Sequence, residues 1–276
     1  MKKTDISEKA YSNLKFLNST SARSLRILSE FLEPENRFKE NSILDTIVFF
    51  GSARLVSKKD ASKNLREFKK STKPNSRGYK DKLKKLEGLL VMSRYYEDAV
   101  ELAEKLTKWS MSLPTNEIKR FIVCSGGGPG IMEAANKGAQ KAGGYSIGLN
   151  ISIPFEQFVN KYVKKELAFE FHYFFMRKFW FAYLAKALIV FPGGFGTLDE
   201  FMEILTLMQT GKIKKNMKVI CYDENYWKSI INFQAFIDYG MISKKDLKLF
   251  DFCSSVDEMY DKIVTHLEKN YLSKNK

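Results

Sequence analysis

The sequence predicts an α/β fold built on a doubly wound parallel sheet. Short apolar runs alternate along the chain with segments of helical periodicity, as in parallel strands that are joined by helices. Two of these runs lead directly into a glycine-rich turn and then into a helical segment. With 276 residues, 44% of them hydrophobic, the chain is long enough for one or two domains and a sizeable core.

The expected strands are short and apolar, as strands buried on both faces of a sheet are. They lie at residues 43–50, 120–124, 145–151, 187–191 and 217–222. Helical spacing of apolar residues predicts helices that begin near 93, 131 and 197, and two more at about 226–237 and 256–269. This order of strands and helices favours the doubly wound arrangement over an antiparallel one.

Two segments lie outside this pattern. Residues 1–43 mix charges with leucines and phenylalanines at helical spacing, so we expect an N-terminal helical extension that ends at Pro34. We expect residues 44–276 to form one Rossmann-like domain. Within it, residues 57–87 hold 12 basic and 4 acidic residues, a net +8 of the chain's +14. We expect a solvated helical insertion there, because exposed charge runs usually serve solubility, with nucleic-acid binding as the alternative.

The most informative stretch is 192–200, which reads Pro-Gly-Gly-Phe-Gly-Thr-Leu-Asp-Glu and follows the strand at 187–191. Its three glycines let the backbone turn sharply and approach a ligand closely. Thr197 is the expected N-cap of the helix that follows. The free N–H groups and the positive dipole end of such a helix suit a phosphate. Glu200, about one turn in, adds a carboxylate, which points to chemistry on a phosphorylated substrate.

A second glycine-rich turn, residues 125–135, follows the strand at 120–124 and again places an acid, Glu133, after its glycines. It lacks the Gly-Lys-Ser/Thr of a Walker A loop. It also lacks the third glycine of a dinucleotide fingerprint, because Ile131 stands at that position. Two such turns are a much stronger signal than one, since open α/β sheets bind ligands at the carboxyl ends of their strands.

Aromatic residues crowd the segment 169–181, which we expect to form a core helix or a contact between subunits. Arg177 lies within this segment, and a guanidinium amid apolar surface needs an anionic partner. His172 is expected to be a structural residue or a pocket wall. Cys124 and Cys221 lie in apolar runs and are expected in the core. With two histidines and no paired cysteine spacing, we expect neither a metal site nor a Ser-His triad.

The two glycine turns, the first strand's Gly51-Ser52 and the Met176-Arg177-Lys178 segment together resemble the Lonely Guy family of nucleoside-monophosphate phosphoribohydrolases, often labelled lysine decarboxylase-like. The resemblance covers roughly residues 44–240. It implies cleavage of the N-glycosidic bond of a nucleoside 5′-monophosphate, AMP or a cytokinin-type N6-modified AMP, without a cofactor. It also implies that Arg177 and Glu200 are catalytic. The implied substrate and phosphate ligands are Gly51, Ser52, Gly126, Gly127, Gly128, Gly130, Glu133, Lys178, Pro192, Gly193, Gly194, Gly196 and Thr197.

The expected chemistry agrees with this resemblance. Breaking the bond builds positive charge on the ribose, as in glycosidases. Near a helix N-terminus, Glu200 is expected to stay ionised, so that it stabilises that charge, holds a ribose hydroxyl or orients water. Arg177 either anchors the phosphate or assists the departing base. The alternatives are a nucleotide or pterin-cofactor carrier without catalysis, a nucleic-acid-binding module, and a PLP decarboxylase, for which neither Lys178 nor Lys186 has the context of a Schiff-base lysine.

The expected partners are a nucleoside monophosphate and further copies of the chain. The aromatic segment favours a homodimer or a higher homo-oligomer. We expect no membrane partner and no nucleic acid. The sequence has no apolar run of transmembrane length and no apolar signal region near its start, and its three cysteines fit a reducing compartment, so the expected location is the cytoplasm.

Overall fold

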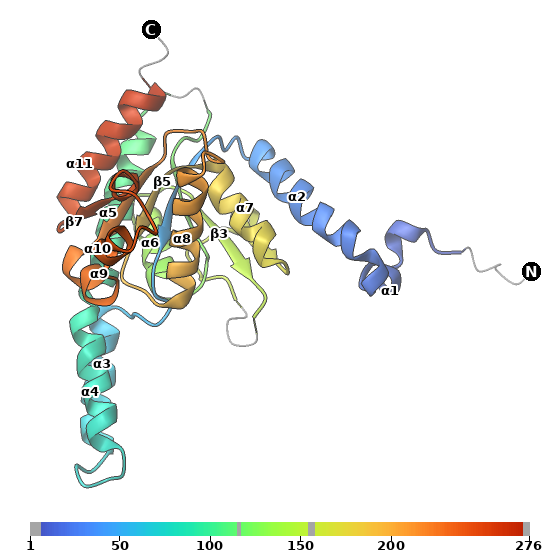
Figure 1. The fold of residues 1–276 in the computed structure, drawn as a ribbon. Coiled ribbons are helices and arrows are strands. Elements are labelled where there is room, and N and C mark those ends of the chain that lie inside the picture. The colour runs from blue at the N-terminus through green and yellow to red at the C-terminus, as the bar shows by residue number, and fades with distance from the viewer. Residues whose placement is uncertain (1–6, 115–116, 154–157, 273–276) are drawn as a thin grey trace, which may run out of the picture.

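A computed structural model describes residues 7–114, 117–153 and 158–272 of the chain. One sheet of seven parallel strands forms its centre, with the strand order β4-β3-β2-β1-β5-β6-β7 (Figure 1). The predicted α/β fold with a doubly wound parallel sheet is therefore confirmed. The strands are β1 Thr46–Phe50, β2 Ile122–Ser125, β3 Ser146–Ile151, β4 Ala168–Phe171, β5 Ala185–Val190, β6 Lys218–Tyr222 and β7 Asp251–Cys253.

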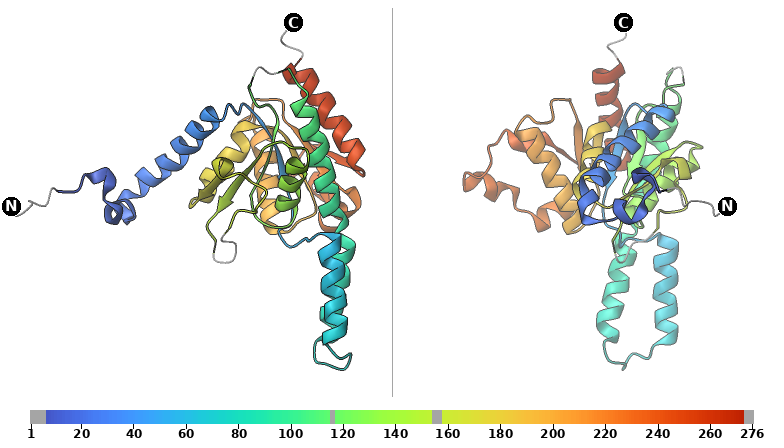
Figure 2. Two further views of the ribbon diagram at one scale, coloured as in Figure 1. Left: turned by 180° about the vertical axis from the view of Figure 1, so that it is seen from behind. Right: turned by 90° about the vertical axis from the view of Figure 1, so that its right-hand side faces the viewer.

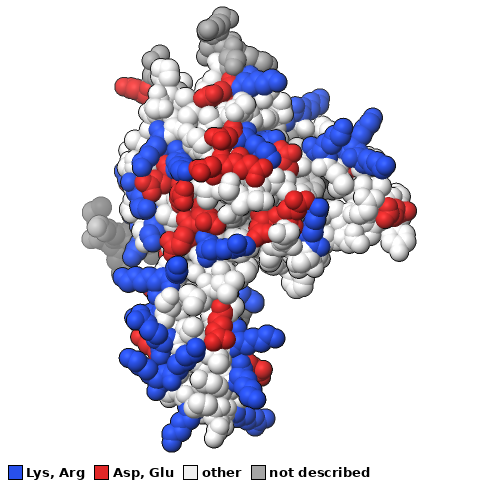
Figure 3. Space-filling view, turned by 90° about the vertical axis from the view of Figure 1, so that its left-hand side faces the viewer, with Lys and Arg blue, Asp and Glu red and all other residues white. Residues whose placement is uncertain are grey.

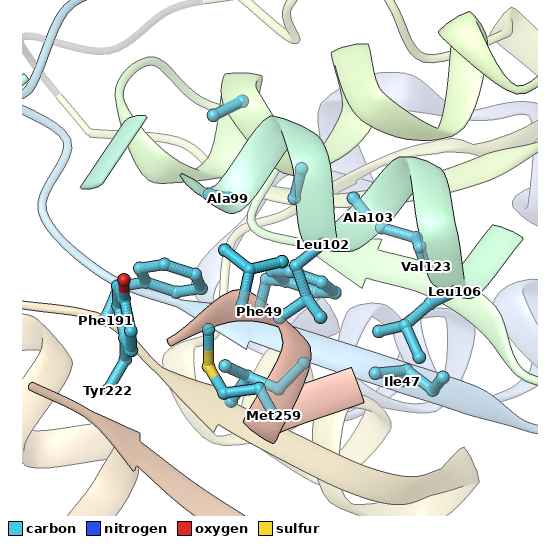
Figure 4. Close-up of a cluster of buried hydrophobic side chains, with 14 of the residues drawn as sticks. Ile47, Phe49, Ala99, Leu102, Ala103, Leu106, Val123, Phe191, Tyr222 and Met259 are labelled. Atoms are coloured by element: carbon cyan, nitrogen blue, oxygen red, sulfur yellow. The ribbon is translucent and has the colours of Figure 1, made fainter. Parts of the chain in front are cut away.

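Helices cover both faces of the sheet. One layer holds α5 Arg94–Met111, α6 Ile131–Lys141 and α11 Val256–Leu267, and the other holds α7 Phe174–Leu184, α8 Phe195–Gln209, α9 Glu224–Ile230 and α10 Phe233–Asp238. Alternate residues of β1 enter different layers: Ile47 and Phe49 pack under α5 and α11 (Figure 4), whereas Val48 and Phe50 pack under α7 and α8. Burial on both faces explains why the strand sequences are continuously apolar.

The two edge strands, β4 and β7, were not predicted. They have 4 and 3 residues, which is too short for a periodicity to stand out. Phe169 and Phe171, which we grouped with the aromatic helix, lie on β4, and α7 begins only at Phe174. The segment 226–237 holds parts of two helices, α9 and α10, where we expected one. Cys124 and Cys221 are buried in the core, as predicted.

The N-terminal segment is helical, but Pro34 does not end its last helix. After α1 Leu14–Leu17, the helix α2 runs from Arg23 to Glu40 with Pro34 inside it. A proline cannot bond to the carbonyl four residues earlier, which here belongs to Glu30. The indole Nε1 of Trp180 donates to that carbonyl at 3.0 Å, so α7 satisfies the group that the proline leaves free. The N-terminal part of α2 and the preceding α1 project away from the body (Figure 2).

A second projection follows β1. Helices α3 Lys58–Ser71 and α4 Tyr79–Met92 form a two-helix hairpin that stands out from the body (Figures 1 and 2). This segment contains the basic insertion, which is helical as predicted and extends to Met92. Short turns complete the structure: 3₁₀ turns at Ala10–Ser12, Thr20–Ala22, Lys165–Leu167 and Asp246–Leu249, and a π-helical turn at Glu268–Leu272. Within the described ranges, we find no helix with the length and apolar character needed to span a bilayer.

Candidate active site

Three turns meet at the carboxyl edge of the sheet, where the strand order reverses between β1 and β5. The N–H of Ser52, after β1, donates to the carbonyl of Pro192, after β5, at 3.1 Å. The carbonyl of Ser52 accepts from Ile131 N–H, at the start of α6, also at 3.1 Å. Gly130 has a φ of +70°, and a Cβ there would lie 2.2 Å from the Ser52 oxygen, so only glycine fits. Doubly wound folds bind ligands at such a reversal.

Arg177 and Glu200 form an ion pair beside these turns. Arg177 comes from α7 and Glu200 from α8, with Nη2 and Oε1 2.9 Å apart and side chains only 11% and 15% exposed. The anionic partner predicted for Arg177 is therefore present. A Cβ added to Gly126 would lie 3.8 Å from Arg177 Nη1, which places the pair against the second glycine turn.

The guanidinium of Arg177 is held between aromatic rings. Its Cζ lies 5.4 Å from the ring centre of Phe174 and 5.5 Å from that of Phe181. Its Nε is buried and has no hydrogen-bond partner within the described residues. Arg177 therefore keeps donor capacity in the site beyond its bond to Glu200.

The carboxyl of Glu200 does not match our expectation of a fully ionised group. Burial raises its pKa to about 7, although the neighbouring Arg177 opposes the shift. Glu200 also lies in the second turn of α8, so it is beyond the first turn, where the helix dipole acts most strongly. Near neutral pH this carboxyl exchanges a proton readily, which suits acid–base chemistry.

Thr197 does not cap the helix that follows the 192–200 stretch. Helix α8 begins at Phe195, two residues earlier than predicted, and Gly194 occupies the N-cap position without a side-chain hydrogen bond. Thr197 lies inside the first turn and is buried, and a Cβ on Gly193 would lie 2.2 Å from its Oγ1. Thr197 thus packs beneath the turn, while Gly194 and Gly196 are exposed at the helix start. The prediction that Thr197 is the N-cap is wrong because the helix starts before this residue.

Several other predicted ligands already have partners within the protein. Lys178 pairs with Asp199 and Glu203, each at 2.8 Å. Glu133 accepts a hydrogen bond from the Tyr96 hydroxyl at 2.7 Å. The N–H of Gly127 donates to Ser125 Oγ at 3.0 Å, so it is not free for a phosphate. A Cβ on Gly51 would lie 2.7 Å from the Ile131 side chain, so this glycine permits close packing on α6.

Two residues that sequence reasoning missed hold the glycine turns in place. Asn160 Nδ2 donates to the carbonyls of Gly127 and Gly128 at 2.9 and 3.1 Å. The hydroxyl of Tyr226 donates to the Gly193 carbonyl at 2.8 Å. Both are single polar residues far along the chain from the turns they contact, and no local pattern marks them. Across the described part of the chain, no group of three His, Cys, Asp or Glu side chains is arranged to hold a metal.

Comparison with known families supports the resemblance seen in the sequence. Residues 132–263 match the family model described as "possible lysine decarboxylase". This segment is a domain of the Lonely Guy family. The match includes Arg177, Glu200 and the whole 192–200 stretch, whereas β1 and the turns at Gly51 and Gly126 precede it.

The curated relatives of this Lonely Guy domain are distant plant proteins. A cytokinin riboside 5′-monophosphate phosphoribohydrolase of Arabidopsis thaliana is 28% identical over 152 residues, which cover 54% of this chain and 64% of the relative. A probable enzyme of the same name from Oryza sativa subsp. japonica is 27% identical over 61% of this chain and 75% of its own length. Among solved structures, the molybdenum cofactor binding protein from Rippkaea orientalis has a TM-score of 0.44 and 19% identity, and it covers 62% of this chain and 86% of its own.

Proposed function

We propose that this protein hydrolyses the N-glycosidic bond of a nucleoside 5′-monophosphate, AMP or an N6-modified AMP, to the free base and ribose 5-phosphate. The observation that carries this proposal is the Arg177–Glu200 pair, which lies beside the glycine turns at the point where the strand order reverses. The names of the plant relatives support the same class of substrate.

The start of α8 is the best candidate for the 5′-phosphate. The first turn of a helix has N–H groups without partners in the helix, and the dipole adds positive potential there. Gly194 and Gly196 leave this end of α8 exposed. No acidic side chain lies in the first turn to compete with an anion. The Tyr226 hydroxyl fixes the turn from below through the Gly193 carbonyl, so its N–H groups are held in place before the ligand arrives.

The ion pair then acts on the ribose and the base. As the bond to the base breaks, positive charge develops on the ribose, and a carboxylate in a mostly buried setting stabilises that charge more than it would in water. Water adds its oxygen to C1′ and loses a proton, which ionised Glu200 can accept because its pKa lies at about 7. The departing base gains a proton, which balances the proton lost by the water. The Arg177 guanidinium bonds Glu200 through Nη2, and its other terminal N–H groups can donate to the base or to the phosphate.

The test is release of free adenine from AMP, followed by chromatography, with adenosine as the matched substrate that lacks the phosphate. We expect AMP to be cleaved far faster than adenosine, because the α8 terminus binds only the phosphorylated form. Equal rates would contradict the phosphate site. AMP that binds but is recovered intact would favour a carrier over an enzyme. A panel of N6-modified monophosphates then ranks the bases.

A further inference from the structure

The hairpin formed by α3 and α4, here called the basic hairpin (residues 58–92), takes no part in the function proposed above. Its acidic residues are few, and most of them interact with nearby side chains. Asp60 interacts with Ser57 at the start of α3, Glu67 lies 3.9 Å from Lys63, and Glu87 lies 3.2 Å from Lys69. The other ten cations of this fully described segment are exposed and make no ion pair: Lys58, Lys59, Arg66, Lys70, Lys73, Arg77, Lys80, Lys82, Lys84 and Lys85.

Several lysines on the surface of the body are paired instead. Lys105 pairs with Glu101 and Asp257, Lys108 and Lys141 pair with Glu104, and Lys262 pairs with Glu258. Figure 3 shows the contrast: basic and acidic side chains lie together over the body, whereas basic ones dominate the hairpin below. Solubility alone does not require this imbalance, because mixed charges serve it equally well without the mutual repulsion of ten neighbouring cations.

The hairpin is not built to enter a lipid bilayer. A membrane-surface helix needs an exposed apolar face opposite its basic one. Here the apolar residues face the partner helix or the body: Ala61 and Leu86 are buried, and Phe68 stacks on Tyr79 with ring centres 5.1 Å apart. Val91, at the base, is the only large hydrophobic residue of the hairpin that is well exposed.

We propose that the basic hairpin binds double-stranded nucleic acid through its phosphate backbone, without sequence preference. The unpaired cations supply the phosphate contacts, and release of counterions from the duplex supplies the free energy. Single strands are usually held by bases stacked on aromatic rings. The hairpin's two rings are stacked on each other, which favours a duplex. This conclusion departs from our expectation of a purely solvated insertion, because the sequence did not reveal how few of the cations are paired.

The length of the hairpin limits the number of phosphates that it can contact, and that number determines how binding depends on salt. Each helix has 14 residues and so spans about 21 Å, roughly the axial length of six base pairs. If about five cations contact phosphates, the logarithm of the binding constant should fall with the logarithm of salt concentration with a slope of about −4 to −5. The probe is a fluorescein-labelled mixed-sequence duplex of about 20 base pairs, followed by anisotropy between about 50 and 300 mM KCl with the full chain.

The decisive variant is Lys59→Gln, Lys70→Gln, Lys80→Gln and Lys84→Gln together. Its control carries Lys→Gln at Lys105, Lys108, Lys141 and Lys262, so it loses the same charge from the body. We expect the hairpin variant to lose at least about tenfold in affinity and the control less than about threefold. Lys→Arg at the four hairpin positions should keep binding, which separates lost charge from lost folding.

The proposal would be overturned by no duplex binding by the full chain at about 100 mM KCl, by equal losses in the hairpin variant and the body control, or by tighter binding to vesicles rich in phosphatidylserine than to the duplex. The last result would assign the hairpin to an anionic lipid surface instead. Tighter binding to the single strand than to the duplex would also contradict it. None of these results depends on turnover of AMP, so the proposed enzymatic function stands or falls separately.

Discussion

The candidate active site and the basic hairpin use charge in opposite ways. At the site, Arg177 and Glu200 are mostly buried and lie within 2.9 Å of each other. On the hairpin, ten cations are exposed and unpaired. Buried charges interact strongly because water screens them little, and loss of one partner leaves the other uncompensated. Exposed charges are screened within about 10 Å and act only together. Single substitutions should therefore matter greatly at the site and little on the hairpin.

Glu200→Gln should have the largest effect of any single change. The substitution keeps the size of the side chain and an oxygen for Arg177, but it removes the charge that faces the developing ribose cation. We expect turnover of AMP to fall about a hundredfold or more, the scale typical of losing one electrostatic stabiliser, while AMP still binds. Single-turnover adenine release and AMP titration measure the two quantities separately.

Asp199→Asn is the matched control for that change. Asp199 is the adjacent residue of α8, but its side chain is 57% exposed and pairs with Lys178, away from Arg177. We expect turnover to change less than about threefold, as for an exposed ion pair. If Asp199→Asn proves more damaging than Glu200→Gln, the catalytic assignment of Glu200 is wrong.

The two partners of the buried pair should differ in what their loss costs the fold. Glu200→Gln replaces a carboxylate whose charge is opposed by burial, as its raised pKa shows, and it keeps an oxygen for Arg177 Nη2. At neutral pH we therefore expect the free energy of unfolding to stay unchanged or to rise. Arg177→Met removes the cation that offsets this burial, and the pKa of Glu200 would rise further without it, so we expect the free energy of unfolding to fall. Urea unfolding at neutral pH should show the larger loss for Arg177→Met. A larger loss for Glu200→Gln would indicate that the unpaired guanidinium dominates.

The raised pKa of Glu200 also predicts how the protein responds to pH. Activity that needs the ionised carboxylate should rise as pH increases to about 7 and then level off. The free energy of unfolding should fall over the pH range in which activity rises. The folded state binds this proton more tightly than the unfolded chain, so Glu200 favours folding at low pH and this contribution is lost as pH rises from about 4.5 to about 7. The Glu200→Gln variant should lack both dependences. Any pH dependence of activity that remains in this variant comes from titration of the substrate phosphate.

The sequence was sufficient where local pattern decides structure. Continuous apolar runs located five of the seven strands, and the glycine turns after them lie together at the carboxyl edge of the sheet. It also implied that Arg177 needs an anion. It failed at Pro34, because the distant Trp180 donates to the carbonyl that the proline leaves free. It also failed at Thr197, because α8 begins two residues earlier and Thr197 packs under Gly193 instead of capping the helix. The pKa of Glu200 depends on burial in the folded chain, and no local pattern contains that information.

The smallest expected effects are those of single hairpin charges on duplex affinity and on adenine release at the active site. Lys70→Gln alone should change duplex affinity less than about threefold, because one of ten screened cations contributes little by itself. Adenine release from AMP should be unchanged within about twofold, even for the variant with all four Lys→Gln changes at about 150 mM salt.

The hairpin follows β1 and the turn at Ser52, so a mechanical link to the site would appear as a salt-independent loss of turnover. A loss only at low salt would instead indicate that the hairpin attracts the substrate dianion toward the site. Adenine release measured at low and physiological salt distinguishes these cases, and a salt-independent loss would mean that the paired site and the unpaired hairpin are not separate units.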